Sequence, residues 1–374
     1  AAHVASRTRI GPRAPGSDPE LREGDAFVLT TRDVVGDARR AGVSYARLPA
    51  DVRTGDDIYL ADGVIHLVVE SVRGKDVRCR IAHGGVLTSR KGLSVPRLRI
   101  GPSLGAKDAA DLEFALALGV DCVAVSFVRG PAAVRQVKSV VKRRGSRALV
   151  VAKIEKREAL GRLGEIVDAA DAIMVARGDL GVEIPPEQVP VAQKRIIDTC
   201  LEKGKPVIVA TQMLLSMVGS ERPTRAEASD VANAALDGAD ALMLSEETAI
   251  GRYPAGSAVM RERIVREAER YRSALSEKEP PRHIESPNDP VEAVCAAAVE
   301  TASHVHARAI ACLTHSGRTA RLIARYRPDL EAIVALTDSA EVIRQTGLLW
   351  GTIGVAVDRI EETDHIMEKT YVYE

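Results

Sequence analysis

Five short apolar runs recur along the middle of the chain, and amphipathic segments separate them. Each run is apolar at consecutive positions rather than at alternate ones, which is typical of strands buried on both faces of a parallel sheet. Strands of this kind that alternate with helices form either a (β/α) barrel or an open parallel sheet. The runs, with the residues that follow them, are VDCVAVSFVR, ALVVAKIE, AIMVARGDLG, PVIVATQML and DALMLSEET.

The segment between the fourth and fifth runs carries the signals of a helix at both ends. Thr224 is a predicted N-cap, and Glu227 stands three residues later, where its carboxylate completes a capping box. Gly238 is placed to end the helix, because glycine readily adopts the left-handed conformation found there. The alternation of strands and helices therefore extends to the fifth run.

All five runs end in polar residues on their C-terminal side. In a parallel barrel these ends meet at one mouth, where the active sites of such barrels lie. A purely structural role would spread polar residues over both ends, so the bias toward one end predicts a functional site. The polar pairs are, in chain order, Ser126 and Arg129, Lys153 and Glu155, Arg177 and Asp179, Thr211 and Gln212, and Ser245 and Glu247.

Two carboxylates and a lysine are the most informative of these side chains. Glu155 and Asp179 follow adjacent runs, and Lys153 precedes Glu155 by two residues. Mg²⁺ takes one or two protein carboxylates and completes its shell with substrate oxygens and water, so the pair predicts a Mg²⁺ or Mn²⁺ site. A lysine beside such a metal stabilises charge on a phosphoryl group or an enolate. The alternative is a buried Lys–Glu ion pair that orders two strands.

Glycines and a threonine close to these carboxylates indicate how a substrate anion binds. Gly178 and Gly181 permit close approach of the backbone, and a helix that starts just after Asp179 would direct N–H groups at a carboxylate or phosphate. A loop tightened for packing is the competing explanation. Thr211 offers a hydroxyl for proton delivery, and the alternative is a β-branched residue that fills a strand end.

A second anion site is predicted near the C-terminus, in the segment LTHSGRTA. An apolar run leads there into hydroxyl groups, a glycine and an arginine at the start of a helix, a combination suited to a phosphate group. A plain serine N-cap explains the same residues equally well. The candidate residues are Thr314, Ser316, Gly317, Arg318 and Thr319.

Composition excludes several classes of protein. Lys+Arg and Asp+Glu both total 52 and the net charge is +0, so the chain lacks the basic character expected of a protein that binds nucleic acid or an anionic membrane. No apolar run is long enough to span a bilayer. The five scattered cysteines, without a Cys-x-x-Cys pair, support neither a disulfide framework nor a zinc site, so we expect a cytoplasmic protein.

The pattern of the chain changes at three places. Residues 1–16 show no periodicity, and we expect them to be an aberrant or fragment-edge segment. Residues 17–97 contain short alternating strands separated by Gly and Asp turns, which predicts a small all-β module. Residues 98–275 hold the strand–helix units, and residues 286–374, after a linker rich in Pro and Glu, are predicted to form a smaller doubly wound α/β domain.

Long motifs in this chain resemble those of the pyruvate kinase family, in order and in spacing. They are VVAKIEKREAL, AIMVARGDLGVEIP, GKPVIVATQMLLSM and RPTRAEASDVANAALDGADALMLSEETAIGRYP, together with GLSVP after SRK. The resemblance implies a partial (β/α)8 TIM barrel with an inserted small β-barrel lid and a C-terminal doubly wound α/β domain. It also implies phosphoryl transfer from phosphoenolpyruvate to ADP, which gives ATP, with protonation of the enolate to pyruvate.

The resemblance carries roles over to individual residues. It implies that Lys153 contacts the phosphoryl group, that Glu155 and Asp179 bind Mg²⁺, and that the backbone of Gly178 and Asp179 holds the substrate carboxylate. Thr211 resembles the residue near the proton-delivery step. The other matching positions are Ser126, Ser245 and Glu247 on the substrate face, Lys91 and Asp62 in the lid over the nucleotide, and the loop THSGRT at the effector site.

The resemblance also has gaps. The first barrel strands of the family, which carry its NFSHG motif and its K⁺ ligands, have no counterpart that we find, and the C-terminal domain lacks its last strands, so we expect a chain truncated at both ends. Glu246 replaces a family glycine beside the metal site. The alternatives are an active pyruvate kinase-like enzyme and a noncatalytic relative that acts as a binding or regulatory subunit. A homotetramer and a sugar-phosphate or nucleotide effector are implied by the resemblance alone.

Overall fold

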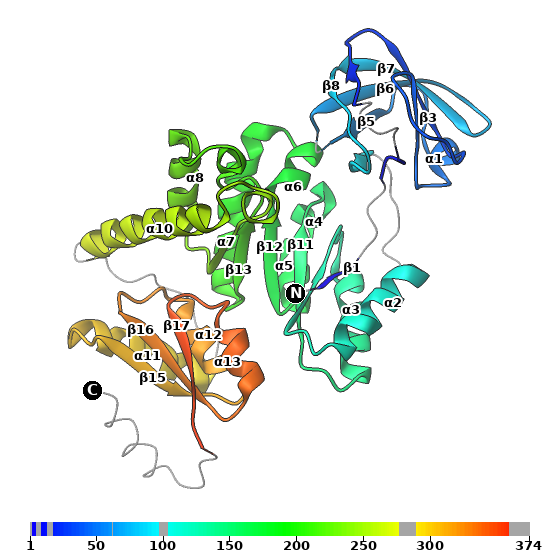
Figure 1. The fold of residues 1–374 in the computed structure, drawn as a ribbon. Coiled ribbons are helices and arrows are strands. Elements are labelled where there is room, and N and C mark those ends of the chain that lie inside the picture. The colour runs from blue at the N-terminus through cyan, green and yellow to red at the C-terminus, as the bar shows by residue number, and fades with distance from the viewer. Residues whose placement is uncertain are drawn as a thin grey trace.

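A computed structural model describes residues 2–4, 9–12, 18–61, 63–96, 104–276 and 289–358. A strand–helix unit occupies the centre, a β-rich unit lies at one end and a smaller α/β unit at the other (Figure 1). Within these residues, no helix combines the length and the apolar character needed to cross a membrane.

The five apolar runs form neighbouring strands of one parallel sheet, as the sequence predicts. A sixth strand joins them at the edge beside the first run, so that the order is β1-β10-β11-β12-β13-β14. β1 and β14 are the two edges of this sheet in the described part of the chain. The strands are β1 (Ala2–Val4), β10 (Cys122–Val125), β11 (Leu149–Ile154), β12 (Ala172–Ala176), β13 (Val207–Ala210) and β14 (Ala241–Met243).

Strand β1 lies inside the segment 1–16 that we expect to be aberrant. Ala2 pairs with Val123 of β10 and Val4 pairs with Val125, in parallel register. Sequence patterns miss this strand because three residues are too few to show a period. The central sheet therefore holds one strand more than the five that the sequence predicts.

The central sheet has a core on each face, because successive residues of a strand point to opposite sides. Val123 and Val150 belong to the set that packs under the surrounding helices. Ala124 and Val151 belong to the other set, which forms a smaller core on the inner face. The helices and 3₁₀ turns of this unit are α2 (Ala106–Ala117), α3 (Pro131–Arg143), α4 (Arg157–Gly161), α5 (Leu163–Ala169), α6 (Arg177–Glu183), η1 (Pro186–Gln188), α7 (Val189–Glu202), η2 (Leu215–Val218), α8 (Arg225–Leu236), α9 (Glu246–Ala249) and α10 (Pro254–Ser276).

The capping box predicted at the start of α8 is present and extends further than expected. Thr224 accepts from the Glu227 amide, and the Glu227 carboxylate accepts from the amide and hydroxyl of Thr224. The same carboxylate accepts from the amide of Ser216 at 2.7 Å and from its hydroxyl at 2.5 Å. Glu227 therefore joins the start of α8 to η2. Burial alone would raise the pKa of Glu227, but these hydrogen bonds outweigh it and hold the pKa below its usual value.

Replacement of Glu227 by Ala is expected to lower the free energy of unfolding by about 1–2 kcal/mol at pH 7. Because the folded-state pKa is lowered, this contribution is complete above about pH 4.3 and is lost as the pH falls through the folded pKa. Urea unfolding of both proteins between pH 7 and pH 3 measures the difference. Glu262→Ala, which removes an exposed ion pair with Arg266 on α10, is the control and should cost less than about 0.5 kcal/mol. A Glu227→Ala difference that does not change with pH would contradict this account.

The β-rich unit follows β1 in the chain. Its main sheet has the order β4-β3-β7-β6-β5-β9, and β2 pairs with β8 beside it. Its core is lined by buried residues such as Phe27, Leu67 and Ile81, and Ile10 joins the same core from outside the sheet. The elements are β2 (Glu20–Leu21), β3 (Ala26–Thr30), β4 (Arg40–Gly42), α1 (Leu48–Asp51), β5 (Asp57–Leu60), β6 (Ile65–Arg73), β7 (Asp76–His83), β8 (Gly85–Val86) and β9 (Leu93–Ser94). We call residues 18–96 of this unit the lid.

The C-terminal unit is a three-stranded parallel sheet in the order β15-β16-β17. It contacts the amino-terminal ends of the central strands: Arg344 pairs with Asp121, just before β10, at 2.9 Å, and Arg327 pairs with Asp240, just before β14, at 2.6 Å. The carboxyl ends of the central strands lie on the side of the lid (Figure 1). The elements are α11 (Pro290–His304), β15 (Ala309–Leu313), α12 (Arg318–Ala324), β16 (Ala332–Thr337), α13 (Ala340–Thr346) and β17 (Thr352–Ala356).

Candidate active site

The alternation of strand residues brings three predicted site residues to the inner face of the central sheet. Val151 lies in the inner core, so Lys153 and Glu155, two and four residues later, continue on that face. Ala124 lies in the same core, and Ser126 follows it by two residues at the end of β10. All three side chains are buried, and they meet at the carboxyl end of the strands.

Lys153 is the centre of this cluster. Its ammonium donates to the Ser126 hydroxyl at 3.1 Å and lies 2.5 Å from Oε1 of Glu155. Oε2 of Glu155 accepts from the backbone amide of Phe127 at 2.6 Å, whereas Oε1 accepts no hydrogen bond within the described residues. The lysine and the glutamate therefore form an ion pair, as the structural alternative expects, and Oε1 contacts this ammonium.

The two predicted metal ligands fit a hard divalent cation in number and kind. Glu155 is 0% exposed, and its Oε1 has the Lys153 ammonium 2.5 Å away but accepts no hydrogen bond from another group within the described residues. Asp179 lies in the first turn of α6, directly after the neighbouring strand β12. Among the residues described, no group of three His, Cys, Asp or Glu side chains forms a metal cage, so a cation here would complete its shell with substrate oxygens and water.

The helix after β12 begins earlier than predicted. We expect it just after Asp179, but α6 begins at Arg177, which places Gly178 and Asp179 in its first turn. The amide of Gly178 donates to Oγ1 of Thr211 at 2.8 Å, and the Thr211 hydroxyl donates to the carbonyl of Ala210 at 2.6 Å. A predicted anion donor and a predicted proton donor are thus in direct contact.

The turn that carries Thr211 is strained. Thr211 has φ +73° and Gln212 has φ +55°, a left-handed conformation that is rare for β-branched side chains. The guanidinium of Arg177 donates to the Thr211 carbonyl at 3.0 Å and to Asp230 at 2.6 Å, which holds this turn in place. Such strain persists where the surroundings enforce it and concentrates at functional sites.

Glu247 lies in α9, just after β14, and its carboxylate points at backbone groups. One oxygen accepts from the amide of Leu214 at 2.9 Å, and the other accepts from the amide of Ser245 at 2.7 Å. The carboxylate thus joins the segments that follow β13 and β14. Glu246, which we expect to place an anion beside the metal, is exposed to solvent.

Of the two lid residues predicted to contact nucleotide, Asp62 lies outside the described residues. Lys91 is half-buried, and its carbonyl accepts from the amide of Ile10 at 2.9 Å. The lid reaches the central unit through Ser94, whose hydroxyl donates to Oε1 of Glu183 at 3.4 Å. This contact puts the lid at the carboxyl-terminal end of α6, the helix that follows β12.

The predicted effector loop has a different cap from the one expected. The N-cap of α12 is Gly317, with φ +73°, rather than Ser316. Arg318 forms an ion pair with Asp289, the N-cap of α11. A cavity of about 540 Å³ lies beside the loop, at the carboxyl ends of the C-terminal strands. Its lining residues are Leu313, Thr314, His315, Leu336, Thr337, Asp338, Val357 and Asp358.

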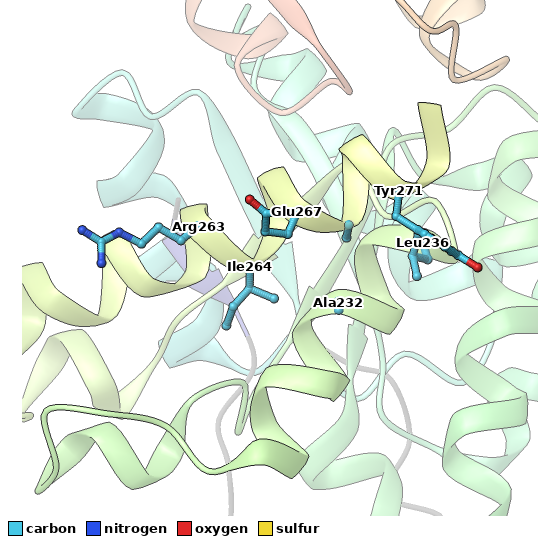
Figure 2. Close-up of a pocket in the computed structure, with 7 residues that line it drawn as sticks. Ala232, Leu236, Arg263, Ile264, Glu267 and Tyr271 are labelled. Atoms are coloured by element: carbon cyan, nitrogen blue, oxygen red, sulfur yellow. The ribbon is translucent and has the colours of Figure 1, made fainter. Parts of the chain in front are cut away.

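An open apolar groove of about 430 Å³ lies elsewhere, between α8 and α10 in the outer layer of helices (Figure 2). It contains none of the polar strand-end residues. The residues that line it are Ala232, Leu236, Arg263, Ile264, Glu267, Ala268 and Tyr271.

Sequence reasoning missed three residues of the site. Phe127 contributes a backbone amide. Any residue type has such a donor, so the sequence indicates this role only through the position of Phe127 directly after Ser126 at a strand end. Lys156 and Glu183 form an ion pair at 2.5 Å although 27 positions separate them in the chain. The presence of Lys156 beside Glu155 is visible in the sequence, but its partner is not.

Comparisons with known proteins agree with this geometry. Residues 5–258 match the pyruvate kinase barrel domain, and residues 292–373 match the pyruvate kinase alpha/beta domain. The chain is 44% identical to a pyruvate kinase of Mycobacterium tuberculosis over 97% of its own length and 76% of the relative. It is 45% identical to one of Corynebacterium efficiens (97% and 75%) and 41% identical to one of Thermococcus litoralis (96% and 77%).

These matches confirm the barrel and the C-terminal α/β fold expected from the sequence. One of the motifs that resemble the family, VVAKIEKREAL, carries Lys153 and Glu155 of the buried cluster. With two domain matches in the same order and relatives of this identity over most of both chains, the chain belongs to the pyruvate kinase family.

Proposed function

We propose that the chain transfers the phosphoryl group of phosphoenolpyruvate to ADP in a Mg²⁺-dependent reaction that yields pyruvate and ATP, the pyruvate kinase step of glycolysis. The observation that carries this proposal is the buried cluster of Ser126, Lys153 and Glu155 at the carboxyl end of the central strands. Relatives named pyruvate kinase over most of both chains favour the enzyme over a noncatalytic binding subunit.

Lys153 stabilises the negative charge that develops on the phosphoryl group and the enolate. Its ammonium is buried, and a charge acts more strongly at such a site than in water because the effective dielectric is lower. The Ser126 hydroxyl and the Glu155 carboxylate hold the ammonium in position before substrate arrives. Little reorganisation is therefore needed when charge develops.

Glu155 and Asp179 are the residues that would hold Mg²⁺ or Mn²⁺. When bound, the cation supplies Lewis-acid stabilisation of phosphoryl and enolate oxygens. K⁺ is expected for the family, and we assign no residue of this chain to it.

The contact between Gly178 and Thr211 gives the substrate carboxylate a defined role. A carboxylate that accepts from the amides of Gly178 and Asp179 displaces the Thr211 hydroxyl from Gly178. The hydroxyl then keeps only its donation to the Ala210 carbonyl, and rotation away from that carbonyl would let it pass a proton to the enolate carbon and recover one from water. Binding of the substrate carboxylate would thus prepare the proton-delivery step.

The remaining assignments concern surrounding residues and the assembly. Ser245 and Glu247 shape the substrate face by holding strand ends, and Lys91 and Asp62 of the lid contact nucleotide. The loop that contains Thr314, Ser316, Gly317, Arg318 and Thr319 binds a sugar-phosphate or nucleotide effector. We further propose a homotetramer located in the cytoplasm.

Turnover coupled to lactate dehydrogenase tests the proposal, with phosphoenolpyruvate, ADP, Mg²⁺ and K⁺ present. NADH oxidation is expected, with loss of the rate when EDTA replaces Mg²⁺ or when ADP is omitted. Direct measurement of ATP by luciferase excludes hydrolysis of phosphoenolpyruvate as the source of pyruvate. Absence of turnover in a folded protein that still binds Mn²⁺ would reject the enzyme and favour the noncatalytic relative.

A further inference from the structure

The orientation of Glu155 depends on the backbone of Phe127. Two groups of the described residues hold this carboxylate: the Phe127 amide donates to Oε2 at 2.6 Å, and the Lys153 ammonium lies 2.5 Å from Oε1. Phe127 has φ +55°, which is uncommon for a bulky residue. The peptide that holds Glu155 therefore needs support from outside its own strand.

Lys156 provides this support from the other side of Glu155. Its ammonium lies 5.6 Å from the centroid of the Phe127 ring, within the range of a cation–π contact. Lys156 is only 7% exposed, and its charge is balanced by Glu183, which is 5% exposed and 2.5 Å away. A buried ammonium of this kind requires its carboxylate partner, so Glu183 fixes where Lys156 stands over the ring.

Glu183 is the last residue of α6, the helix whose first turn holds Gly178 and Asp179. Arg157 donates to the Glu183 carbonyl through Nε at 3.1 Å and through a terminal nitrogen at 2.9 Å. The segment after β11 is thus attached to the end of α6 by a side-chain ion pair and by a guanidinium–carbonyl contact. The pair spans the two elements that carry the proposed metal ligands.

The same Glu183 oxygen also contacts the lid. Oε1 accepts from Lys156 and, at 3.4 Å, from the hydroxyl of Ser94. One residue earlier on α6, Val182 packs so closely against the turn at Gly63 that a Cβ on this glycine would lie 3.1 Å from the valine methyl group. The lid therefore touches the central unit at the end of α6, on the partner of Lys156.

We propose that Lys156 and Glu183 are positioning residues. They hold the Phe127 peptide against Glu155, and the Glu183 carboxylate is the point at which lid contact reaches this carboxylate. The inference rests on the proposed function, because it concerns the geometry of a residue assigned there to the metal. An ion pair that only ordered two elements would not place one partner over the Phe127 ring and the other under the lid.

Mn²⁺ binding to the protein without substrate, followed by electron paramagnetic resonance, tests the positioning role directly. Lys156→Met is expected to raise the Mn²⁺ Kd by about 10- to 100-fold, as loss of a group that orients a metal ligand does. Lys156→Arg keeps the charge and the ring contact and is expected to recover most of the affinity. Lys138→Met, which breaks the Lys138–Asp171 pair at the opposite end of the strands, is the matched control with unchanged Kd.

Two further variants test the ion pair if Lys156→Met does not fold, and test the lid contact. If Lys156→Met does not fold, the double variant Lys156→Met with Glu183→Met leaves no unpaired buried charge and is expected to show the same loss of Mn²⁺ affinity. Ser94→Ala is expected to raise the Mn²⁺ Kd by about 2- to 10-fold, the effect of one hydrogen bond, because it removes the lid contact to Glu183.

Glu155→Gln separates failure of this inference from failure of the proposed function. If Glu155→Gln leaves the Mn²⁺ Kd unchanged, Glu155 is not a metal ligand and the proposed function loses its metal assignment. If Glu155→Gln weakens Mn²⁺ binding but folded Lys156→Met or the double variant does not, the ion pair is purely structural and the positioning role is wrong. A Ser94→Ala protein with the wild-type Mn²⁺ Kd would remove the lid from the proposal.

Discussion

Lys153→Met is expected to lower kcat by about 10²- to 10³-fold, the usual cost of removing one positioned charge that stabilises a transition state. The ammonium is buried, contacts Ser126 at 3.1 Å and lies 2.5 Å from Glu155. Methionine keeps the length and the apolar stem of the side chain but carries no charge. The lost term is therefore electrostatic, and KM should change much less than kcat.

The Lys153→Met experiment needs a check on folding, because the substitution leaves the Glu155 carboxylate without its counter-ion. The Phe127 amide still donates to Glu155, so we expect a folded protein with a lower unfolding midpoint. Circular dichroism establishes the fold before the coupled assay is run. Lys138→Met, remote from the site, should retain the wild-type kcat. A folded Lys153→Met protein with unchanged kcat would show that this ammonium plays no part in the chemistry.

The elements that the sequence predicts best are those determined by local periodicity. Lys153 and Glu155 stand two residues apart on a strand, so their common face follows from the strand period alone. Ser126 joins them because parallel strands in register bring equivalent ends together, Val125 pairing with Ala152. Thr224 and Glu227 form their capping box for the same reason, since the interaction spans only one helical turn.

Contacts between distant segments are the part that the sequence does not reveal. The Gly178–Thr211 hydrogen bond joins two strand ends, and which atoms meet there depends on the start of α6 and on the positive φ of Thr211. Glu247 is predicted to lie on the substrate face, and the structure adds that its carboxylate accepts from two backbone amides. Side-chain direction at such a turn is set by tertiary packing, which residue type does not encode.

Asp240 joins the central unit to the C-terminal unit through several hydrogen bonds. One carboxylate oxygen accepts from the amide of Val207 at 2.9 Å and from Arg327 at 2.6 Å, and the other accepts from the amide of Trp350 at 3.0 Å. Two cations lie near the Trp350 ring: its centroid is 4.0 Å from the guanidinium carbon of Arg272 and 5.2 Å from that of Arg327. A single carboxylate thus fixes the start of β13, the start of β14 and the C-terminal unit.

Asp240→Ala is expected to lower the free energy of unfolding of the C-terminal unit by about 3–5 kcal/mol, because it leaves the buried Arg327 guanidinium without its counter-ion and two amides without an acceptor. Trp350 is the only tryptophan of the chain, so its fluorescence reports this contact alone. In urea, the fluorescence transition of the variant should precede the loss of far-ultraviolet circular dichroism, whereas both coincide in the wild type.

Arg344→Ala is the matched control at the same contact between units. It removes the Arg344–Asp121 ion pair, whose side chains are 54% and 34% exposed, and an ion pair of that exposure contributes less than about 1 kcal/mol. The difference between the two variants therefore measures how much more a buried ion pair contributes to stability than an exposed one. If Asp240→Ala costs no more than Arg344→Ala and its two transitions still coincide, the C-terminal unit is held by apolar packing around Trp350 and Leu349 instead of by Asp240.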